Sequence, residues 1–390
     1  MHIAVVSPHL PTPAMPMRGL SHDEQLAVFA EAGHHVRAVV PVAWSPRRWL
    51  AGTRIPEEER DGAVVVAHPR YPRVPRFMRG RSLERHLFAR AAATALAAGE
   101  AAPDVVLAHS ASLPGGLIGR VGGARFVVAL YDHELYDVAP HSATAREAIA
   151  RALRSADCVV YVSEALRRHG ISVAGPHRTV VIPIGIKPYP ELSAVWPEHF
   201  TVCTVARLIA RKRVDQLIRV FARLAGERPD VRLVIVGDGP ERPALARLVR
   251  ALGIVGLVEM TGALDARSAR ERLSRASVMA LASVRESLAA AYFEAMSLGV
   301  PALGTRGEGI EEHVDHGIDG ILVPPDDDAA LLAELRALAA DPDRARRIGA
   351  AGRRRYLAGS FTWRASAEAY LALFTELTRD RARRYPPSLR

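Results

Sequence analysis

The chain has very little lysine. Only two of its 390 residues are lysine, against 50 arginines. Arginine presents a planar fork and lysine a compact point charge on a flexible stem, so a site that needs a point charge against phosphate oxygens resists replacement of lysine by arginine. Lys212 is therefore a candidate phosphate ligand, with chance survival of two lysine codons as the alternative.

Cysteine and long apolar runs are scarce as well. Cys158 and Cys203 each lie in a short apolar run typical of a buried strand, so we expect core thiols and neither a disulfide nor a metal pair. No apolar run reaches the roughly 18 residues that a membrane helix needs, and the chain enters a strand at His2 without a charged leader. We expect a soluble, cytoplasmic protein.

The formal net charge of +10 suggests an anionic partner. Nucleic acid does not fit, because the chain has no repeating basic and aromatic platform, no Cys/His finger and no basic recognition helix. Much of the excess is local, with seven arginines between Arg70 and Arg90 and five between Arg379 and Arg390.

Strand-like and helical runs alternate twice along the chain, which predicts an α/β fold with parallel sheets covered on both faces. In the first half we expect strands over residues 2–7, 35–40, 64–67, 104–108, 125–130, 158–162 and 179–182, and helices over 21–32 and 82–98. In the second half we expect strands over 201–206, 232–237, 258–261, 277–281, 301–304 and 320–323, and helices over 214–226, 243–252, 267–275, 289–298 and 329–340.

A proline-rich stretch over residues 183–197 is the best candidate linker. We therefore predict two doubly wound domains that face each other across a cleft, residues 1–190 and residues 198–362. A last helix over residues 363–378 is expected to pack back on the first domain.

The most informative motif runs from Ser283 to Pro301. A strand ends before it and a helix is expected to begin near Leu288, so free backbone N–H groups and the positive helix end form an anion seat suited to a diphosphate. The small side chains of Ala289, Ala290 and Ala291 would let phosphate approach the backbone.

Two carboxylates flank this seat. Glu286 stands just before the expected helix and Glu294 about two turns in, roughly 12 Å apart if the segment is helical throughout. Carboxylates repel phosphate but suit sugar and ribose hydroxyls. A core helix with an incidental acidic cap is the alternative, but Arg207 and Lys212 follow the first strand of the same domain and should lie at the same edge of its sheet.

The second half resembles the donor domain of the retaining glycosyltransferases of family 4, which have the GT-B fold of two Rossmann-like domains. The matching pieces, in the family's order over residues 200 to 365, are Ala206-Arg207-Leu208 with Lys212, Val234–Pro240, the pair Glu286 and Glu294, Glu308–Glu312, and Gly320–Pro325. The resemblance implies that Arg207 and Lys212 hold the diphosphate, Glu286 the transferred sugar and Glu294 the ribose.

Three departures from the family pattern bear on these roles. The usual glycines are replaced by Ala206 and by Arg213, and the common Gly-Phe-Gly is replaced by Ser287-Leu288-Ala289. The last departure touches the sugar pocket, so the identity of the sugar stays open.

The first half resembles the family more loosely. The backbone amide of Gly19 occupies the glycine-loop position, where it could approach donor phosphate. The family carries a histidine at the reaction centre after the strand over 125–130; without gaps Tyr131 falls there, and His133 follows two residues later. We favour His133, with an exposed loop histidine as the alternative.

Two other chemistries are disfavoured. Gly237-Asp238-Gly239-Pro240 is too short for the dinucleotide fingerprint, which argues against a nicotinamide enzyme. The run from Asp326 to Asp328 precedes a helix and is expected to cap it. No Asp-x-Asp metal grip is present, and two cations with a helix end would make a divalent ion unnecessary.

We therefore predict a retaining, metal-independent glycosyltransferase without a cofactor, which takes its sugar from a nucleotide-diphosphate sugar such as a UDP- or GDP-sugar. The acceptor is expected in polysaccharide or glycolipid biosynthesis, with Arg70 to Arg90 resting on the inner face of the membrane or forming a solvated basic surface. The alternatives are a natural-product glycosyltransferase acting on a small aglycone and a catalytically silent nucleotide-sugar sensor.

Overall fold

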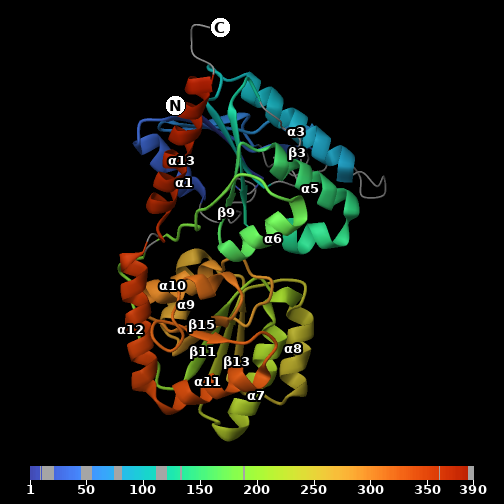
Figure 1. The fold of residues 1–390 in the computed structure, drawn as a ribbon. Helices are drawn as coiled ribbons and strands as arrows, with labels where there is room; N and C mark the ends of the chain where they lie inside the picture. The colour runs from blue at the N-terminus through green and yellow to red at the C-terminus, as the bar shows by residue number, and fades with distance from the viewer. Residues whose placement is uncertain are drawn as a thin grey trace. The chain divides into compact units, whose positions relative to one another are not determined.

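The computed structural model describes residues 1–8, 10, 22–44, 55–73, 81–110, 121–131, 134–187, 189–359 and 361–384. These residues form two compact α/β units, which confirms the predicted fold class (Figure 1). The first unit comprises Met1–Gly185 with Thr362–Arg390, and the second comprises Ile186–Phe361.

In the first unit, eight strands of the described residues form one sheet in the order β10-β9-β8-β7-β1-β2-β5-β4. The parallel strands are β1 (His2–Val6), β2 (His35–Val39), β5 (Val64–Ala67), β7 (Val105–His109), β8 (Arg125–Leu130), β9 (Cys158–Tyr161) and β10 (Thr179–Val181). Their apolar runs are buried because helices cover the sheet.

One edge of this sheet was not predicted. Strand β4 (Glu58–Asp61) pairs antiparallel with β5 through a two-residue turn at Gly62, whose φ is +58°. Its charged sequence hides it from a search for apolar runs, although glycine at the first position of a two-residue loop, here Gly62, is a recognised hairpin signal. A separate pair of strands, β3 (Val42–Trp44) and β6 (Arg70–Pro72), lies parallel beyond β2 and β5.

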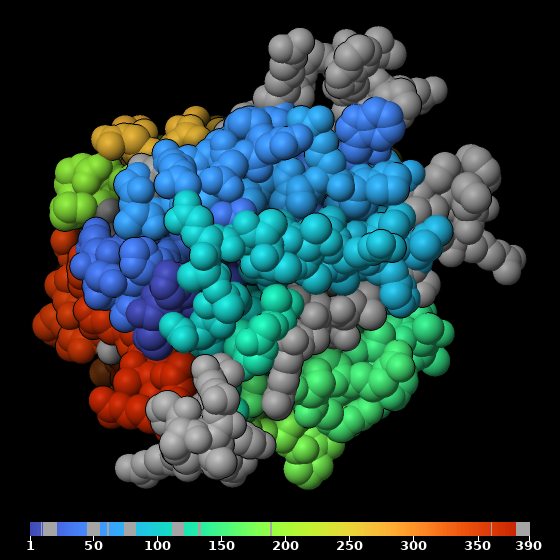
Figure 2. All heavy atoms as spheres, turned by 90° about the horizontal axis from the view of Figure 1, so that it is seen from above, coloured from blue at the N-terminus to red at the C-terminus, as the bar shows by residue number. Residues whose placement is uncertain are grey.

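The helices of the first unit include one from the far end of the chain. Helix α13 (Trp363–Arg384) packs against α1 (His22–Glu31), with the Phe29 and Phe374 rings 5.8 Å apart (Figure 1). In Figure 2 the red spheres of α13 lie beside the dark blue spheres of the chain start, where Thr378 Oγ1 is 4.0 Å from Met1 Sδ. The other helical segments are α3 (Arg81–Ala97), η3 (Glu134–Val138), η4 (Ala139–His141), α5 (Ala143–Ser155) and α6 (Glu164–Ala174).

The second unit has a six-stranded parallel sheet in the order β13-β12-β11-β14-β15-β16 among the residues described there. Its strands are β11 (Thr201–Val205), β12 (Arg232–Val236), β13 (Val258–Gly262), β14 (Val278–Ala280), β15 (Ala302–Thr305) and β16 (Ile321–Val323). Its helical segments are η5 (Ala210–Lys212), α7 (Val214–Glu227), α8 (Arg242–Ala251), η6 (Val255–Leu257), α9 (Ala266–Ser274), α10 (Ala290–Leu298), η7 (Gly309–Glu312), α11 (Asp328–Ala340) and α12 (Pro342–Ala358).

Helix α12 was not predicted, because it is rich in arginine and contains two glycines. Those glycines serve packing: a Cβ on Gly349 would overlap the backbone carbonyl of Gly299, where α10 ends. The helix can therefore lie close against α10, which carries part of the candidate site.

Three smaller expectations are also settled. Cys158 and Cys203 are buried free thiols, and burial raises the pKa of Cys158 to about 11 and that of Cys203 to about 12. Asp327 caps α11 by accepting from Ala330 N at 2.9 Å. Within the described ranges, no helix combines the length and the apolar character needed to cross a membrane.

Candidate donor-binding site

Three neighbouring parallel strands of the second unit bring the site together. Strand β11 pairs with β14, and β14 pairs with β15. The segments that follow their carboxyl ends carry Arg207 to Lys212 after β11, Glu286 and α10 after β14, and Glu308 after β15. Since parallel strands end at one edge of a sheet, these segments form one crevice edge, the usual ligand position in such folds.

The two groups expected to bind different parts of a donor are bonded to each other. Lys212 Nζ donates to Glu286 Oε2, and the Glu286 side chain is only 2% exposed. Arg211 Nη1 lies 3.7 Å from the same carboxylate oxygen and donates to the Arg285 carbonyl at 3.1 Å. Glu286 therefore faces two cations, and Lys212 Nζ uses one of its three N–H donors on Glu286.

Arg211 was missed by the sequence analysis. It is one arginine among 50, and its position beside Lys212 gives no sign that its side chain is buried at 8% exposure. Its carbonyl also accepts from Val284 N at 2.9 Å. Arg211 therefore connects the loop after β11 with the loop after β14 through both its backbone and its side chain.

Arg207 is an exposed cation in the loop before η5. Within the described residues its side chain has no ion pair or side-chain hydrogen bond, while the following Leu208 is fixed by its N–H donating to Asp238 O at 2.9 Å. A Cβ on Gly237 would overlap the Ala206 carbonyl, so glycine at this position lets the loop after β12 lie close to the loop after β11. This backbone contact does not involve the Arg207 side chain, which can therefore bind a ligand.

The helix of the proposed anion seat starts later than predicted. Helix α10 begins at Ala290, and Ser287, Leu288 and Ala289 lie in the loop before it. Ala289 is the N-cap residue, and among the described residues no side chain caps the helix; Tyr292 N donates to the Ala289 carbonyl at 3.2 Å, which leaves the N–H groups of Ala290 and Ala291 to a ligand. The helix therefore begins within two residues of the expected start, and because Glu286 lies in the loop before it, the condition attached to the 12 Å estimate, helix from Glu286 to Glu294, is not met.

The core-helix alternative holds only in part. Most of α10 is buried, so it is a core helix. Glu286 is not its acidic cap, however, because the Glu286 carboxylate is bonded to Lys212 and lies outside the helix.

Glu294, on α10, is held by an arginine that the sequence analysis also missed. Arg270 Nη2, from α9, donates to Glu294 Oε1 at 2.9 Å, and the Arg270 guanidinium lies 4.5 Å from the centre of the Tyr189 ring. Burial raises the pKa of the Glu294 carboxyl, and the charge of Arg270 opposes that rise. Glu294 is thus a desolvated carboxyl group on the second turn of α10, the helix whose first turn forms the proposed anion seat.

Comparison with known proteins identifies the family of the chain. Residues 193–355 match the family profile described as "Glycosyl transferases group 1", and residues 24–188 match "Glycosyltransferase Family 4". The GDP-mannose-dependent alpha-(1-6)-phosphatidylinositol monomannoside mannosyltransferase of Mycolicibacterium smegmatis is 30% identical over 356 residues, which is 86% of this chain and 90% of that protein. The chain belongs to glycosyltransferase family 4.

Solved structures show the same fold for this glycosyltransferase. Sucrose-phosphate synthase from Thermosynechococcus elongatus superposes with a TM-score of 0.79 at 21% identity, covering 97% of this chain and all of that one. The Anabaena protein HepE in complex with UDP-glucose superposes with a TM-score of 0.71 at 16% identity, covering 96% of this chain and all of that one. Both likenesses support the GT-B fold of the glycosyltransferase.

The predicted residues of the first unit are described only in part. Gly19 and His133 lie outside the described residues. Tyr131 follows β8 in the glycosyltransferase, with its ring 5.0 Å from that of His22 and 5.9 Å from that of His109. Burial raises its pKa well above the usual value, and it shares a hydrogen bond with Tyr370 of α13. Tyr131 therefore takes part in attaching α13 to the sheet.

A hollow of about 350 Å³ lies between β6 and α3 of the glycosyltransferase. Its walls are mostly apolar, and Arg70 and Arg90 line it as well. Both arginines are exposed, so the described residues of β6 and α3 form an apolar groove beside two positive charges.

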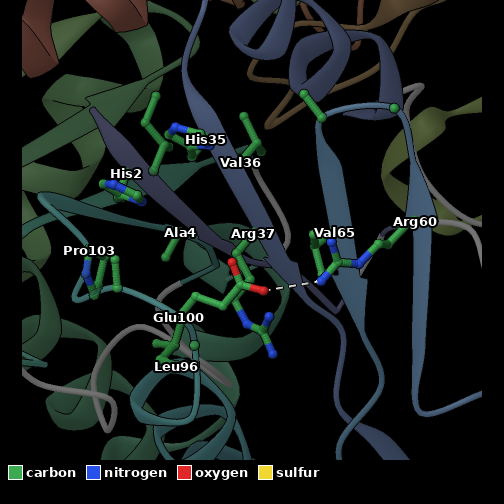
Figure 3. Close-up of a pocket in the computed structure, with 15 residues that line it drawn as sticks. His2, Ala4, His35, Val36, Arg37, Arg60, Val65, Leu96, Glu100 and Pro103 are labelled. Atoms are coloured by element: carbon green, nitrogen blue, oxygen red, sulfur yellow. Dashed lines mark hydrogen bonds and ion pairs between the residues drawn. The ribbon is translucent and has the colours of Figure 1, made fainter.

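Another hollow, of about 210 Å³, lies at the amino-terminal ends of β1, β2 and β5 in the sheet of the first unit (Figure 3). The His2 and His35 rings stack at 4.7 Å, and Arg60 reaches Glu100 at 3.3 Å across its mouth. Arg37 is paired with Glu58 at 3.2 Å. Because its arginines already have carboxylate partners, this hollow offers no ready set of charges to a ligand of the glycosyltransferase.

Proposed function

We propose that the chain transfers a sugar from a nucleoside-diphosphate sugar to a hydroxyl group of an acceptor, with retention of anomeric configuration and without a metal ion. The observation that carries the proposal is the set of groups at one crevice edge: the exposed Arg207, the Lys212–Glu286 pair and the uncapped start of α10. A diphosphate needs cations and N–H donors, and a sugar needs hydroxyl acceptors, which this edge supplies together.

In this proposal the diphosphate binds to Arg207, to Lys212 and to the first-turn N–H groups of α10. Lys212 directs a further N–H donor to a phosphate oxygen when the donor enters, which weakens its hold on Glu286. Arg211 stays beside Glu286 at 3.7 Å, so the carboxylate keeps one cation and gains an oxygen that is free to accept from a sugar hydroxyl. Ser287, Leu288, Ala289 and Ala290 border the bound donor.

Glu294 is assigned to the ribose. It stands on the second turn of α10, on the side of Arg270, so a nucleoside can extend from a diphosphate seated at the start of the helix. Arg270 keeps one carboxylate oxygen occupied and leaves the other for ribose hydroxyl groups.

The transfer step follows from these roles. The acceptor hydroxyl forms a bond to the anomeric carbon on the face from which the nucleoside diphosphate leaves, and its proton passes to a diphosphate oxygen. Arg207, Lys212 and the helix end stabilise the charge that develops on the leaving group. No divalent ion is required, since two cations and a helix end already face the diphosphate.

The acceptor side is proposed to handle a glycolipid or a growing polysaccharide at an anionic membrane surface. Two observations support this: the groove between β6 and α3 beside Arg70 and Arg90, and the relative whose name specifies a phosphatidylinositol monomannoside acceptor. Apolar and basic groups side by side suit a lipid with an anionic head group.

The test is an assay of nucleoside diphosphate release from a panel of GDP- and UDP-sugars, with and without EDTA, followed by proton NMR of the product formed with an added acceptor. The proposal expects release from at least one donor, the same rate in EDTA, and a product whose anomeric configuration equals that of the donor. An inverted product or strict dependence on added magnesium would contradict it.

A further inference from the structure

Glu308 occupies the N-cap position of η7, but its side chain binds another loop instead of capping that helix. It precedes η7 and makes no side-chain cap bond to it. Its Oε1 accepts from Arg285 N at 2.8 Å and its Oε2 accepts from Glu286 N at 2.6 Å. One carboxylate thus binds two consecutive N–H groups of the loop that carries Glu286.

The same stretch is held from its other side. Gly309 N donates to the Glu286 carbonyl at 3.1 Å, and Arg211 Nη1 donates to the Arg285 carbonyl at 3.1 Å. Arg285 has φ of +54°, a left-handed conformation that non-glycine residues seldom adopt and that surrounding contacts must maintain. Glu308 supplies the only charged acceptor among these contacts.

The position of this peptide matters because Glu286 comes four residues before the start of α10. A shift of the Arg285–Glu286 peptide would move the Glu286 carboxylate relative to the N–H groups of the helix. Charge-assisted hydrogen bonds are roughly twice as strong as neutral ones, so loss of the Glu308 charge weakens the hold on both amides.

We propose that Glu308 is a positioning residue for sugar transfer, whose ionised carboxylate holds the Arg285–Glu286 peptide so that Glu286 meets the sugar while the diphosphate occupies the start of α10. The inference rests on the proposed function and assigns to Glu308 a role in the transfer step rather than in nucleotide binding.

Protonation of Glu308 should break this hold. Burial raises its pKa, the two backbone N–H groups lower it, the charge of Glu286 raises it and that of Arg211 lowers it, with a net rise above the ordinary 4.5. A protonated carboxyl cannot accept fully from both amides. Turnover at saturating donor should therefore fall on the acid side, with the loss beginning at a higher pH than an ordinary glutamate would give.

The experiment compares Glu308→Gln with Glu311→Gln. Glu311 lies on η7 and accepts from Gly307 N at 2.7 Å without contacting the Glu286 loop, so it is a matched control for loss of one carboxylate. Glu308→Gln should lower kcat by roughly 10- to 100-fold at pH 7.5, because a displaced Glu286 loses about the equivalent of one charge-assisted hydrogen bond to the sugar in the transition state. Its affinity for the free nucleoside diphosphate should stay within about threefold of wild type, because Glu308 is not among the groups proposed to bind the nucleotide.

The pH profile adds a signature that mere structural support would not give. Glutamine imitates the protonated state at every pH, so the acid-side loss of kcat due to Glu308 should disappear from the variant, while Glu311→Gln should keep it. If Glu308→Gln does not fold, Glu308→Asp, which keeps the charge on a shorter side chain, is measured in its place: its kcat should fall, while its acid-side loss should remain because aspartate still titrates. The inference is overturned by an unchanged kcat in the variant measured, by an unchanged acid limb in Glu308→Gln, or by a loss of nucleotide affinity as large as the loss of kcat.

Amide hydrogen exchange separates this inference from the proposed function, because it needs no donor. Exchange at residues 285 and 286 should rise at least tenfold in Glu308→Gln and stay unchanged in Glu311→Gln. Unchanged exchange in the first variant refutes the inference by itself. Absence of transfer by the wild-type protein with every donor refutes the proposed function.

Discussion

Removal of the Arg270 side chain should destabilise the second unit in a way that depends on pH. Arg270 is 7% exposed and Glu294 is 16% exposed, with Nη2 and Oε1 2.9 Å apart. Removing one partner of a buried pair leaves the other charge uncompensated, which costs about 3 to 5 kcal/mol. The contact between Arg270 and the Tyr189 ring contributes about 1 kcal/mol of that loss at any pH.

The sign of the pH dependence follows from Glu294. Its pKa is already raised by burial, and Arg270 opposes the rise, so Arg270→Ala raises it further. Above 4.5 the unfolded carboxyl releases its proton while the folded one keeps it, so stability falls as pH rises from 4.5 to the folded pKa. Each unit of this pKa difference costs about 1.4 kcal/mol.

We therefore expect Arg270→Ala to lower the free energy of unfolding by about 3 kcal/mol or more at pH 7.5 and by clearly less at pH 5, where a larger fraction of Glu294 is protonated. Native-state hydrogen exchange of β12 amides in increasing urea reports on the second unit alone. Adding Glu294→Gln to Arg270→Ala should restore more than about 1 kcal/mol at pH 7.5, because no buried charge is left unpaired.

Arg267→Ala is the matched control. Arg267 lies on the same helix, is 57% exposed, and pairs with Glu191 and Glu271 at the surface. It should change stability by less than about 0.5 kcal/mol. Equal penalties for Arg270→Ala at pH 5 and pH 7.5, or no recovery in the double variant, would refute the reasoning.

Three further outcomes are expected. Replacing Arg207 or Lys212 by Ala should lower turnover by roughly 100-fold or more without unfolding the protein, and near-normal turnover in a steady-state assay would remove that residue from the phosphate site. Glu294→Ala should weaken binding of free nucleoside diphosphate in calorimetry, whereas Glu286→Ala should spare it and impair transfer; equal losses of affinity would contradict these roles. Vesicles with acidic lipid should sediment the wild-type protein at low salt but release a triple glutamine variant, since each cation contributes about 1 kcal/mol, and failure of the wild type to sediment would refute the membrane contact. That variant replaces the arginines Arg70, Arg73 and Arg90.

Periodicity and apolar runs predicted the fold class and most parallel strands, because a strand buried on both faces is apolar almost throughout. Strand β4 and helix α12 escaped prediction for the opposite reason. Their sequences are charged, and their positions depend on a hairpin turn at Gly62 and on close contact at Gly349.

For the donor site, the sequence predicted only which residues lie near one edge of the second sheet. Which cation meets which carboxylate depends on side-chain packing, so the pairing of Lys212 with Glu286 could not be read from spacing. The roles of Arg270 and Glu308 were hidden for a related reason: each side chain bonds to a residue more than twenty positions away, through a contact made only in the folded chain.

The most direct test of the donor site is a thermal-shift titration of the wild-type protein with the panel of nucleoside-diphosphate sugars, beside a Lys212→Ala/Glu294→Ala variant. A donor present at 100 times its dissociation constant adds about 2.7 kcal/mol of stability, which should appear as a clear rise of Tm for at least one wild-type donor pair and vanish in the variant. A wild-type protein whose Tm responds to no donor, or a variant whose Tm rises as much as that of the wild type, would contradict the placement of the site at the edge formed by β11, β14 and β15.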